Sequence, residues 1–113
     1  MKIALIGYGK MGQAIESIAI ERGHDIVLKI NIHNLQDFTK ENLSKADVAI
    51  EFTGPDSAVN NIRGCFEANV PVVCGSTGWQ KHMPEVNDLC KAKKVGFLYA
   101  SNFSLGVNIF FEE

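Results

Sequence analysis

The chain opens with Met1-Lys-Ile-Ala-Leu-Ile6 and runs directly into Gly7-Tyr-Gly-Lys-Met-Gly12. The first run is apolar, which predicts a β-strand over Lys2–Ile6. The second run is a G-x-G-x-x-G pattern, and the apolar residues after it are spaced like one face of a helix over residues 10–22. That expected face consists of Met11, Ala14, Ile15, Ile18 and Ala19. A strand, a tight glycine turn and a helix in this order are typical of a dinucleotide-binding site.

Each glycine of the pattern has its own expected role. Gly7 permits the sharp turn, Gly9 has no Cβ and lets the backbone approach a pyrophosphate, and Gly12 lets the helix pack closely on the strand. The helix N-terminus adds unpaired N–H groups and the positive end of the helix dipole. The alternative is that three glycines form an ordinary turn between a strand and a helix.

Strands and helices alternate along the rest of the chain. Gly23 is expected to end the first helix. Thr53-Gly-Pro-Asp56 predicts the start of a helix capped by Thr53, which continues to Ala68. Further strands are predicted over residues 25–32, 47–52, 71–74 and 95–99, a further helix over 84–94, loops over 34–46 (with at most one helical turn near 42–45) and 100–106, and a starting helix over 107–113.

This alternation predicts an α/β fold with a doubly wound parallel sheet, that is, an NAD(P)-binding Rossmann-type domain. Residues 1–113 form one such domain in this interpretation. The apolar run Asn108-Ile-Phe-Phe111 needs something to pack on, so we interpret the chain as a piece of a longer protein.

Composition narrows the class of protein. The 113 residues carry a net charge of −2, with 46% hydrophobic residues. This balance is normal for a globular domain and argues against nucleic acid or a membrane surface as the partner. No apolar run approaches the roughly 20 residues of a membrane span, and the N-terminus does not resemble a signal peptide. We therefore expect a cytoplasmic protein.

No residue of the chain is assigned a catalytic or metal-binding role. The three cysteines are odd in number and form no C-x-x-C motif, and the histidines lack metal-ligand spacing. Cys65 and Cys90 are expected as small buried residues on helix faces. Cys74 ends a strand next to a glycine loop, yet nothing marks it as a nucleophile. Trp79 is expected either to line a cofactor cleft or to pack on the sheet edge.

The loops at the carboxyl ends of the predicted strands are the candidate ligand site, because open α/β sheets bind ligands there. Nearly all of them are small, glycine-rich or hydroxyl-bearing. The position at the end of the second strand, where an acidic residue is expected for the adenosine ribose, holds Asn31. Lys29 and His33 are nearby. The choice between NAD and NADP therefore stays open.

Four motifs taken together resemble one family, 4-hydroxy-tetrahydrodipicolinate reductase. The motifs are Ile6-Gly-Tyr-Gly-Lys-Met-Gly12, Glu51-Phe-Thr53 with Pro55, Val73-Cys-Gly-Ser-Thr-Gly78, and Ala100-Ser-Asn-Phe-Ser104 with Gly106-Val-Asn108. The resemblance covers essentially the whole chain but only the N-terminal, cofactor-binding domain of the family. It implies cofactor-binding roles for Gly7, Tyr8, Gly9, Lys10, Met11, Gly12, Asn31, Phe52, Thr53, Gly75, Ser76, Thr77, Ala100, Ser101, Asn102 and Phe103.

The resemblance also implies what the remainder of the enzyme does. The family transfers a hydride from NAD(P)H to a small dicarboxylate heterocycle in lysine and diaminopimelate biosynthesis, and its full enzyme is a homotetramer. Its His-His pair, following Lys and Pro-Ser-Gly-Thr segment belong to a C-terminal catalytic and tetramerisation domain that this chain lacks.

Two other readings of the sequence stay open. The chain is alternatively a free-standing NAD(P)-binding or redox-sensing module without catalysis. It is also compatible with the cofactor domain of another two-domain dehydrogenase.

Overall fold

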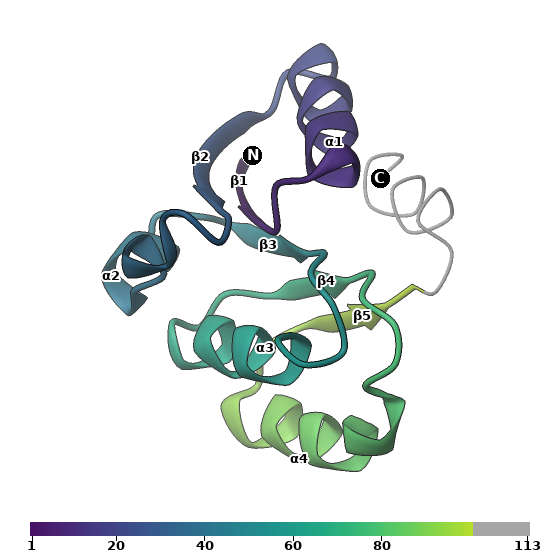
Figure 1. The fold of residues 1–113 in the computed structure, drawn as a ribbon. Coiled ribbons are helices and arrows are strands. Elements are labelled where there is room, and N and C mark those ends of the chain that lie inside the picture. The colour runs from purple at the N-terminus through teal and green to yellow at the C-terminus, as the bar shows by residue number, and fades with distance from the viewer. Residues whose placement is uncertain (101–113) are drawn as a thin grey trace.

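The structure is a computed structural model that describes residues 1–100. Its centre is a five-stranded sheet in the order β2-β1-β3-β4-β5, in which every neighbouring pair is parallel (Figure 1). The strands are β1 (Lys2–Ile6), β2 (Asp25–Ile30), β3 (Val48–Glu51), β4 (Val72–Cys74) and β5 (Phe97–Tyr99). The helices are α1 (Lys10–Glu21), α2 (Lys40–Leu43), α3 (Ala58–Glu67) and α4 (Met83–Lys93), with short 3-10 turns η1 (Leu35–Asp37) and η2 (Gln80–His82).

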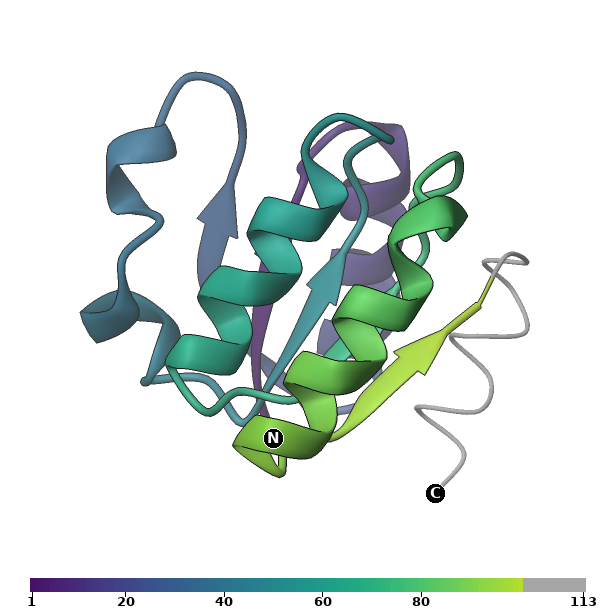
Figure 2. The same ribbon diagram turned by 90° about the horizontal axis from the view of Figure 1, so that it is seen from below.

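Both faces of the sheet are covered, as alternation along β1 requires. Ile3 and Leu5 point to the face on which Ile15 and Ala19 of α1 pack. Ala4 and Ile6 point to the opposite face, which is covered by α2, α3 and α4 through Leu43, Ile62 and Val86 respectively. Figure 2 shows α3 and α4 side by side across that second face. The predicted doubly wound parallel sheet is confirmed.

The chain order places a switch point at the centre of the sheet. From β1 the chain moves outward to β2, and from β3 it moves the other way to β4 and β5. The carboxyl ends of β1 and β3 therefore lie side by side while their following connections diverge to opposite faces. In folds of this kind the ligand lies across that point.

The end of β2 differs from the prediction. The strand stops at Ile30, two residues before the predicted end at residue 32. Side-chain amides turn the chain instead: the Asn31 N–H donates to Asn34 Oδ1 at 2.7 Å, and the Asn34 amide donates to the Lys29 carbonyl at 2.7 Å. Asparagine side chains of this kind compete with strand hydrogen bonding.

Two helix starts also differ from the prediction. α2 begins at Lys40 rather than near residue 42, because the Thr39 hydroxyl accepts from the Asn42 N–H at 3.1 Å. α3 begins only at Ala58, so Thr53 does not cap it. The Thr53 hydroxyl donates to Glu51 instead, which removes it from a capping role.

The buried stripe of α1 is narrower than the predicted apolar face. Gly12, Ile15 and Ala19 are buried, whereas Met11 is 39% exposed and Ala14 is exposed. The helix turns about 100° per residue, so a stripe centred on positions 12, 15 and 19 leaves position 11 at its margin and position 14 on the far side of the helix. The predicted stop at Gly23 is confirmed, with φ +84° at that residue.

The remaining predictions divide between the described residues and those beyond them. Cys65 is buried as expected, whereas Cys90 is only half-buried, although it packs against the core. Within residues 1–100 every helix is too short or too polar to span a bilayer. The predicted loop over 100–106, apart from Ala100, and the predicted helix over 107–113 lie outside the described residues.

Candidate functional site

A cavity of about 480 Å³ opens at the carboxyl ends of β1, β2 and β3, at the switch point of the sheet. Its wall is mainly apolar, and its polar side chains are few. The lining residues are Ile6, Gly7, Tyr8, Gly9, Ile30, Asn31, Ile32, Leu35, Phe52, Thr53, Gly54, Ser57 and Asn61. A concave, mainly apolar site with a few convergent polar groups is the form that small-molecule and cofactor sites take.

The three glycines of the first turn meet different surroundings. A Cβ at Gly7 would lie 2.1 Å from the Phe52 carbonyl oxygen, and Gly7 has φ +106°. A Cβ at Gly12 would lie 2.5 Å from the Gly7 carbonyl oxygen. A Cβ at Gly9 would meet nothing within 4 Å. Protein packing therefore requires glycine at positions 7 and 12, while at position 9 the space is open to a ligand.

The turn delivers the start of α1 to this open space. Gly9 is the N-cap residue of α1, and no side chain caps this end of the helix. The first N–H groups of a helix have no partner within the helix, and they carry the positive end of its dipole. A dinucleotide pyrophosphate fits such an end, and the vacant position around Gly9 leaves room for it.

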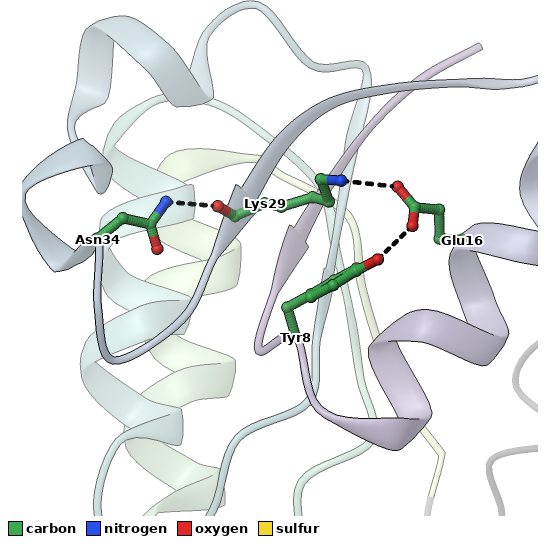
Figure 3. A network of polar contacts seen from close by, with 4 residues as sticks. All are labelled: Tyr8, Glu16, Lys29 and Asn34. Atoms are coloured by element: carbon green, nitrogen blue, oxygen red, sulfur yellow. Dashed lines mark hydrogen bonds and ion pairs between the residues drawn. The ribbon is translucent and has the colours of Figure 1, made fainter.

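Tyr8 anchors the turn to α1 and β2 through a small polar network (Figure 3). Its hydroxyl donates to Glu16, which also pairs with Lys29 at 3.1 Å, and the Lys29 ammonium lies 4.9 Å from the centre of the Tyr8 ring. The hydrogen bond from Tyr8 and then that from Lys29 lower the pKa of Glu16. The bond to Glu16 raises the pKa values of both Tyr8 and Lys29. Lys29 is thus committed to Glu16 rather than free for a ligand.

Asn31 lies at the far end of the cavity, directly after β2. Its Oδ1 accepts from the His33 N–H at 2.8 Å, so the side chain stabilises the turn that follows. Next to it, Ile32 and Leu35 are 80% and 61% exposed, although both are large and apolar. Their exposure at the cavity gives this end an apolar surface, which suits a flat aromatic ring.

The opposite end of the cavity is lined by the loop after β3, and the loop after β4 packs behind it. Phe52 lines the cavity, and a Cβ at Gly75 would lie 2.2 Å from its ring. The Ser76 hydroxyl accepts from the Thr53 N–H at 2.8 Å and donates to Glu51 at 2.5 Å. These contacts join two loops that are more than twenty residues apart in the sequence.

Glu51 is a site feature that the sequence interpretation missed. It is fully buried at the end of β3, where its carboxylate accepts from Thr53, Asn61, Cys74 and Ser76. The signal was present in the sequence: one acidic residue ends an otherwise apolar strand, and a threonine stands two residues later. Asn61 was missed as well, and it lines the cavity from α3.

Trp79 packs inside the fold rather than lining the cavity. It is fully buried against Phe97 and Tyr99, with ring centres 6.0 and 5.4 Å away, and its indole N–H donates to the Ser76 carbonyl at 2.7 Å. It therefore stabilises the loop after β4 from behind.

The cysteines have the character of structural residues. Burial raises the pKa of Cys65 to about 12, and it raises that of Cys74, with the nearby Glu51 charge adding to both shifts. Both thiols stay protonated, as poor nucleophiles. Across residues 1–100 no group of three or more His, Cys, Asp or Glu side chains is arranged to hold a metal ion.

The predicted cofactor residues fall into four groups. Gly7, Tyr8, Gly9, Asn31, Phe52 and Thr53 line the cavity, and Gly75 and Ser76 lie behind this wall, in contact with Phe52 and Thr53. Lys10, Met11, Gly12, Thr77 and Ala100 are not among the lining residues. Ser101, Asn102 and Phe103 lie outside the described residues.

A parallel sheet with a central switch point, a glycine turn at the start of α1 and a cavity across its carboxyl edge define a Rossmann-type dinucleotide-binding domain. Comparison with known proteins adds the family. Residues 1–103 match the family described as dihydrodipicolinate reductase, N-terminus, and the chain belongs to it. The resemblance seen in the sequence, and with it the class of NAD(P)-binding reductase domain, is confirmed.

Curated relatives agree with this assignment. A 4-hydroxy-tetrahydrodipicolinate reductase of Christiangramia forsetii is 49% identical over 99% of this chain and 46% of its own length. One of Methanococcus aeolicus is 31% identical over 96% of this chain and 34% of its own length. The chain thus spans less than half the length of the curated relatives it matches.

Solved structures support the fold. A dipicolinate-bound dihydrodipicolinate reductase from Paenisporosarcina sp. TG-14 matches with a TM-score of 0.78 at 23% identity, covering 93% of this chain and 48% of that one. A homoserine dehydrogenase of S. aureus matches with a TM-score of 0.67 at 21% identity, covering 88% of this chain and 32% of that one. At these identities the likeness concerns the fold alone.

Proposed function

We propose that this chain is the NAD(P)H-binding half of a 4-hydroxy-tetrahydrodipicolinate reductase. The observation that carries the proposal is the open space at Gly9, beside the uncapped start of α1, in a chain of this family. Gly7 and Gly12 are required by the protein's own packing, whereas Gly9 is required only if something else occupies that space.

The residues that line the cavity indicate the orientation in which the proposed cofactor binds. The pyrophosphate lies over Gly9 and the start of α1, as in other folds of this type. The adenosine lies toward Asn31, with its ring on the apolar surface of Ile32 and Leu35. The nicotinamide then lies on the other side of β1, over Phe52 and Thr53. When bound, the cofactor supplies the hydride, and this chain binds and orients it.

The substrate and the assembly belong to the whole protein. A solved relative carries dipicolinate, so we propose a planar dicarboxylate heterocycle as substrate. Proton donation and substrate binding are assigned to a second domain, and the full enzyme is proposed to be a homotetramer in the cytoplasm. No acid–base pair at the cavity of the described residues competes for that role.

Titration of the chain with NADH and NADPH by calorimetry, paired with a reductase assay, tests this proposal. We expect both cofactors to bind and the heterocycle not to be turned over by this half alone. Absence of any dinucleotide binding would favour a different role for the fold. Turnover at the rate of an intact reductase would show that the acid–base residues lie within these 113 residues.

A further inference from the structure

Glu51 is the one charged side chain among residues 1–100 that is fully buried. Burying a carboxylate is costly unless hydrogen bonds replace those it made to water. The hydrogen-bond partners of Glu51 therefore determine whether its carboxylate is stable in the interior. None of the ion pairs in the described part of the chain involves it. Its charge is held by uncharged groups alone.

All the partners of Glu51 are donors. Ser76 Oγ at 2.5 Å and Cys74 Sγ at 3.3 Å donate to Oε1. Asn61 Nδ2 at 3.0 Å and the Thr53 hydroxyl donate to Oε2. The Ser76 oxygen already accepts from the Thr53 N–H, so its own hydrogen points to Glu51. A set of donors on both oxygens suits an ionised carboxylate, which only accepts.

The cluster of Glu51 and its four partners lies directly behind one end of the cavity. Thr53 and Asn61 belong to the cavity wall and touch the carboxylate at the same time. Ser76 fixes the loop after β4 to the loop after β3. Glu51 does not line the cavity itself, and it contacts cavity-lining residues that a bound cofactor would touch.

We propose that Glu51 is a positioning residue for the nicotinamide end of the cofactor site, and that its buried negative charge makes this end favour the oxidised nicotinamide over the reduced one. The inference rests on the proposed function. The nicotinamide ring is neutral when reduced and positively charged when oxidised. Because the rest of the dinucleotide is the same in both forms, a negative charge near the ring favours only the oxidised form.

This arrangement has a consequence for hydride donation. Positive charge develops on the ring as the hydride leaves, and a fixed charge that favours the product form of the ring also favours the transition state. The Thr53 and Ser76 groups transmit a second effect, because Glu51 sets the direction of both hydroxyl hydrogens. Charge and orientation are separable by two different substitutions.

The test compares dissociation constants for NAD⁺, NADH and ADP-ribose in the full chain, with Glu51→Gln, Glu51→Asp and the control Glu67→Gln. Glu67 is an exposed glutamate on the same helix as Asn61, so the control makes the same chemical change away from the site. Near-ultraviolet circular dichroism checks the fold of each variant. ADP-ribose lacks the nicotinamide and reports the remainder of the site.

For Glu51→Gln we expect the ratio of the NAD⁺ to the NADH dissociation constant to rise about fivefold to tenfold, with ADP-ribose binding unchanged within about twofold. For Glu51→Asp we expect an unchanged ratio, because the charge stays, and a several-fold loss for both nicotinamide forms, because the hydroxyls lose their fixed direction. Glu67→Gln should change none of the three.

An unchanged ratio in a folded Glu51→Gln protein overturns the charge effect. If Glu51→Gln does not fold, Glu51→Asp decides. A changed ratio of the NAD⁺ to the NADH dissociation constant in Glu51→Asp overturns the charge effect. Wild-type affinities of Glu51→Asp for both nicotinamide forms overturn the positioning role. If the wild-type chain binds ADP-ribose and both nicotinamide forms while the ratio never moves, this inference fails and the proposed function stands. If the wild-type chain binds none of them, the proposed function fails first.

Discussion

The ring of Phe52 lies against Gly75 so closely that a Cβ at Gly75 would come within 2.2 Å of it. Phe52 also lines the cavity, so this contact determines where the wall of the site stands. The loop after β4 thereby sets the position of a side chain from the loop after β3.

We expect Gly75→Ala to destabilise the domain by about 1–3 kcal/mol, as overpacking of a tight contact does, and to weaken cofactor binding by displacing the Phe52 ring. Chemical denaturation and cofactor titration measure the two effects. The double variant Gly75→Ala with Phe52→Leu removes the ring from the collision and should recover most of the stability. A single variant as stable as the wild type would show that the ring moves freely.

We expect Gly9→Val to abolish dinucleotide binding while the fold persists, because the added side chain meets no protein atom within 4 Å of the new Cβ and enters the space needed by the pyrophosphate. The matched variant is Gly12→Ala, whose Cβ would lie 2.5 Å from a backbone oxygen. That variant should lose stability instead. Circular dichroism with a cofactor titration distinguishes them, and retained binding in the Gly9 variant contradicts the assignment of the turn.

We expect Asn31→Asp to shift preference toward NADH over NADPH by roughly tenfold, because a carboxylate accepts from a ribose diol and repels a 2′-phosphate. The substitution keeps an acceptor for the His33 N–H, so the turn should survive. The ratio of the two dissociation constants is the measurement. If the ratio stays constant here but changes in His33→Ala, the ribose contact lies two residues further along.

We expect Glu16→Gln to weaken the acid dependence of stability. The bonds from Tyr8 and Lys29 lower the pKa of Glu16, so its contribution is present above the ordinary carboxyl value of 4.5 and is lost as pH falls through the lowered pKa. The effect is small, about 1 kcal/mol or less, because the Lys29 side chain is 46% exposed and solvent screens the pair. Melting temperatures from pH 7 down to pH 3 test it, with Glu21→Gln on the same helix as control. Parallel curves for wild type and Glu16→Gln would contradict it.

The order of the elements and the cavity's position could be predicted because they depend on patterns that extend over many residues. β1 was predicted with its observed bounds, since an apolar run ends abruptly at Gly7. Alternation of strands and helices then implied a parallel sheet with its site at the carboxyl edge. These inferences need only periodicity and glycine positions, which a sequence displays directly.

Local hydrogen bonds caused the errors. β2 ends earlier than predicted because the side chains of Asn31 and Asn34 turn the chain. Contrary to the prediction, Thr53 does not cap the following helix, because its hydroxyl donates a hydrogen bond to Glu51. The cluster around Glu51 joins residues from β3, α3, β4 and the following loop, up to 25 positions apart. A single sequence does not reveal which distant hydroxyls share one carboxylate.

The buried position of Trp79 gives the domain an optical property. It is the chain's one tryptophan, and its indole N–H holds the Ser76 carbonyl in the loop behind the proposed nicotinamide end. Reduced nicotinamide absorbs near-ultraviolet light in the range where a buried tryptophan emits. We therefore expect resonance energy transfer from Trp79 to a reduced cofactor bound in the cavity. Tryptophan fluorescence should decrease while the fluorescence of the reduced cofactor increases. The domain would report the occupancy of its site by light, with no label attached.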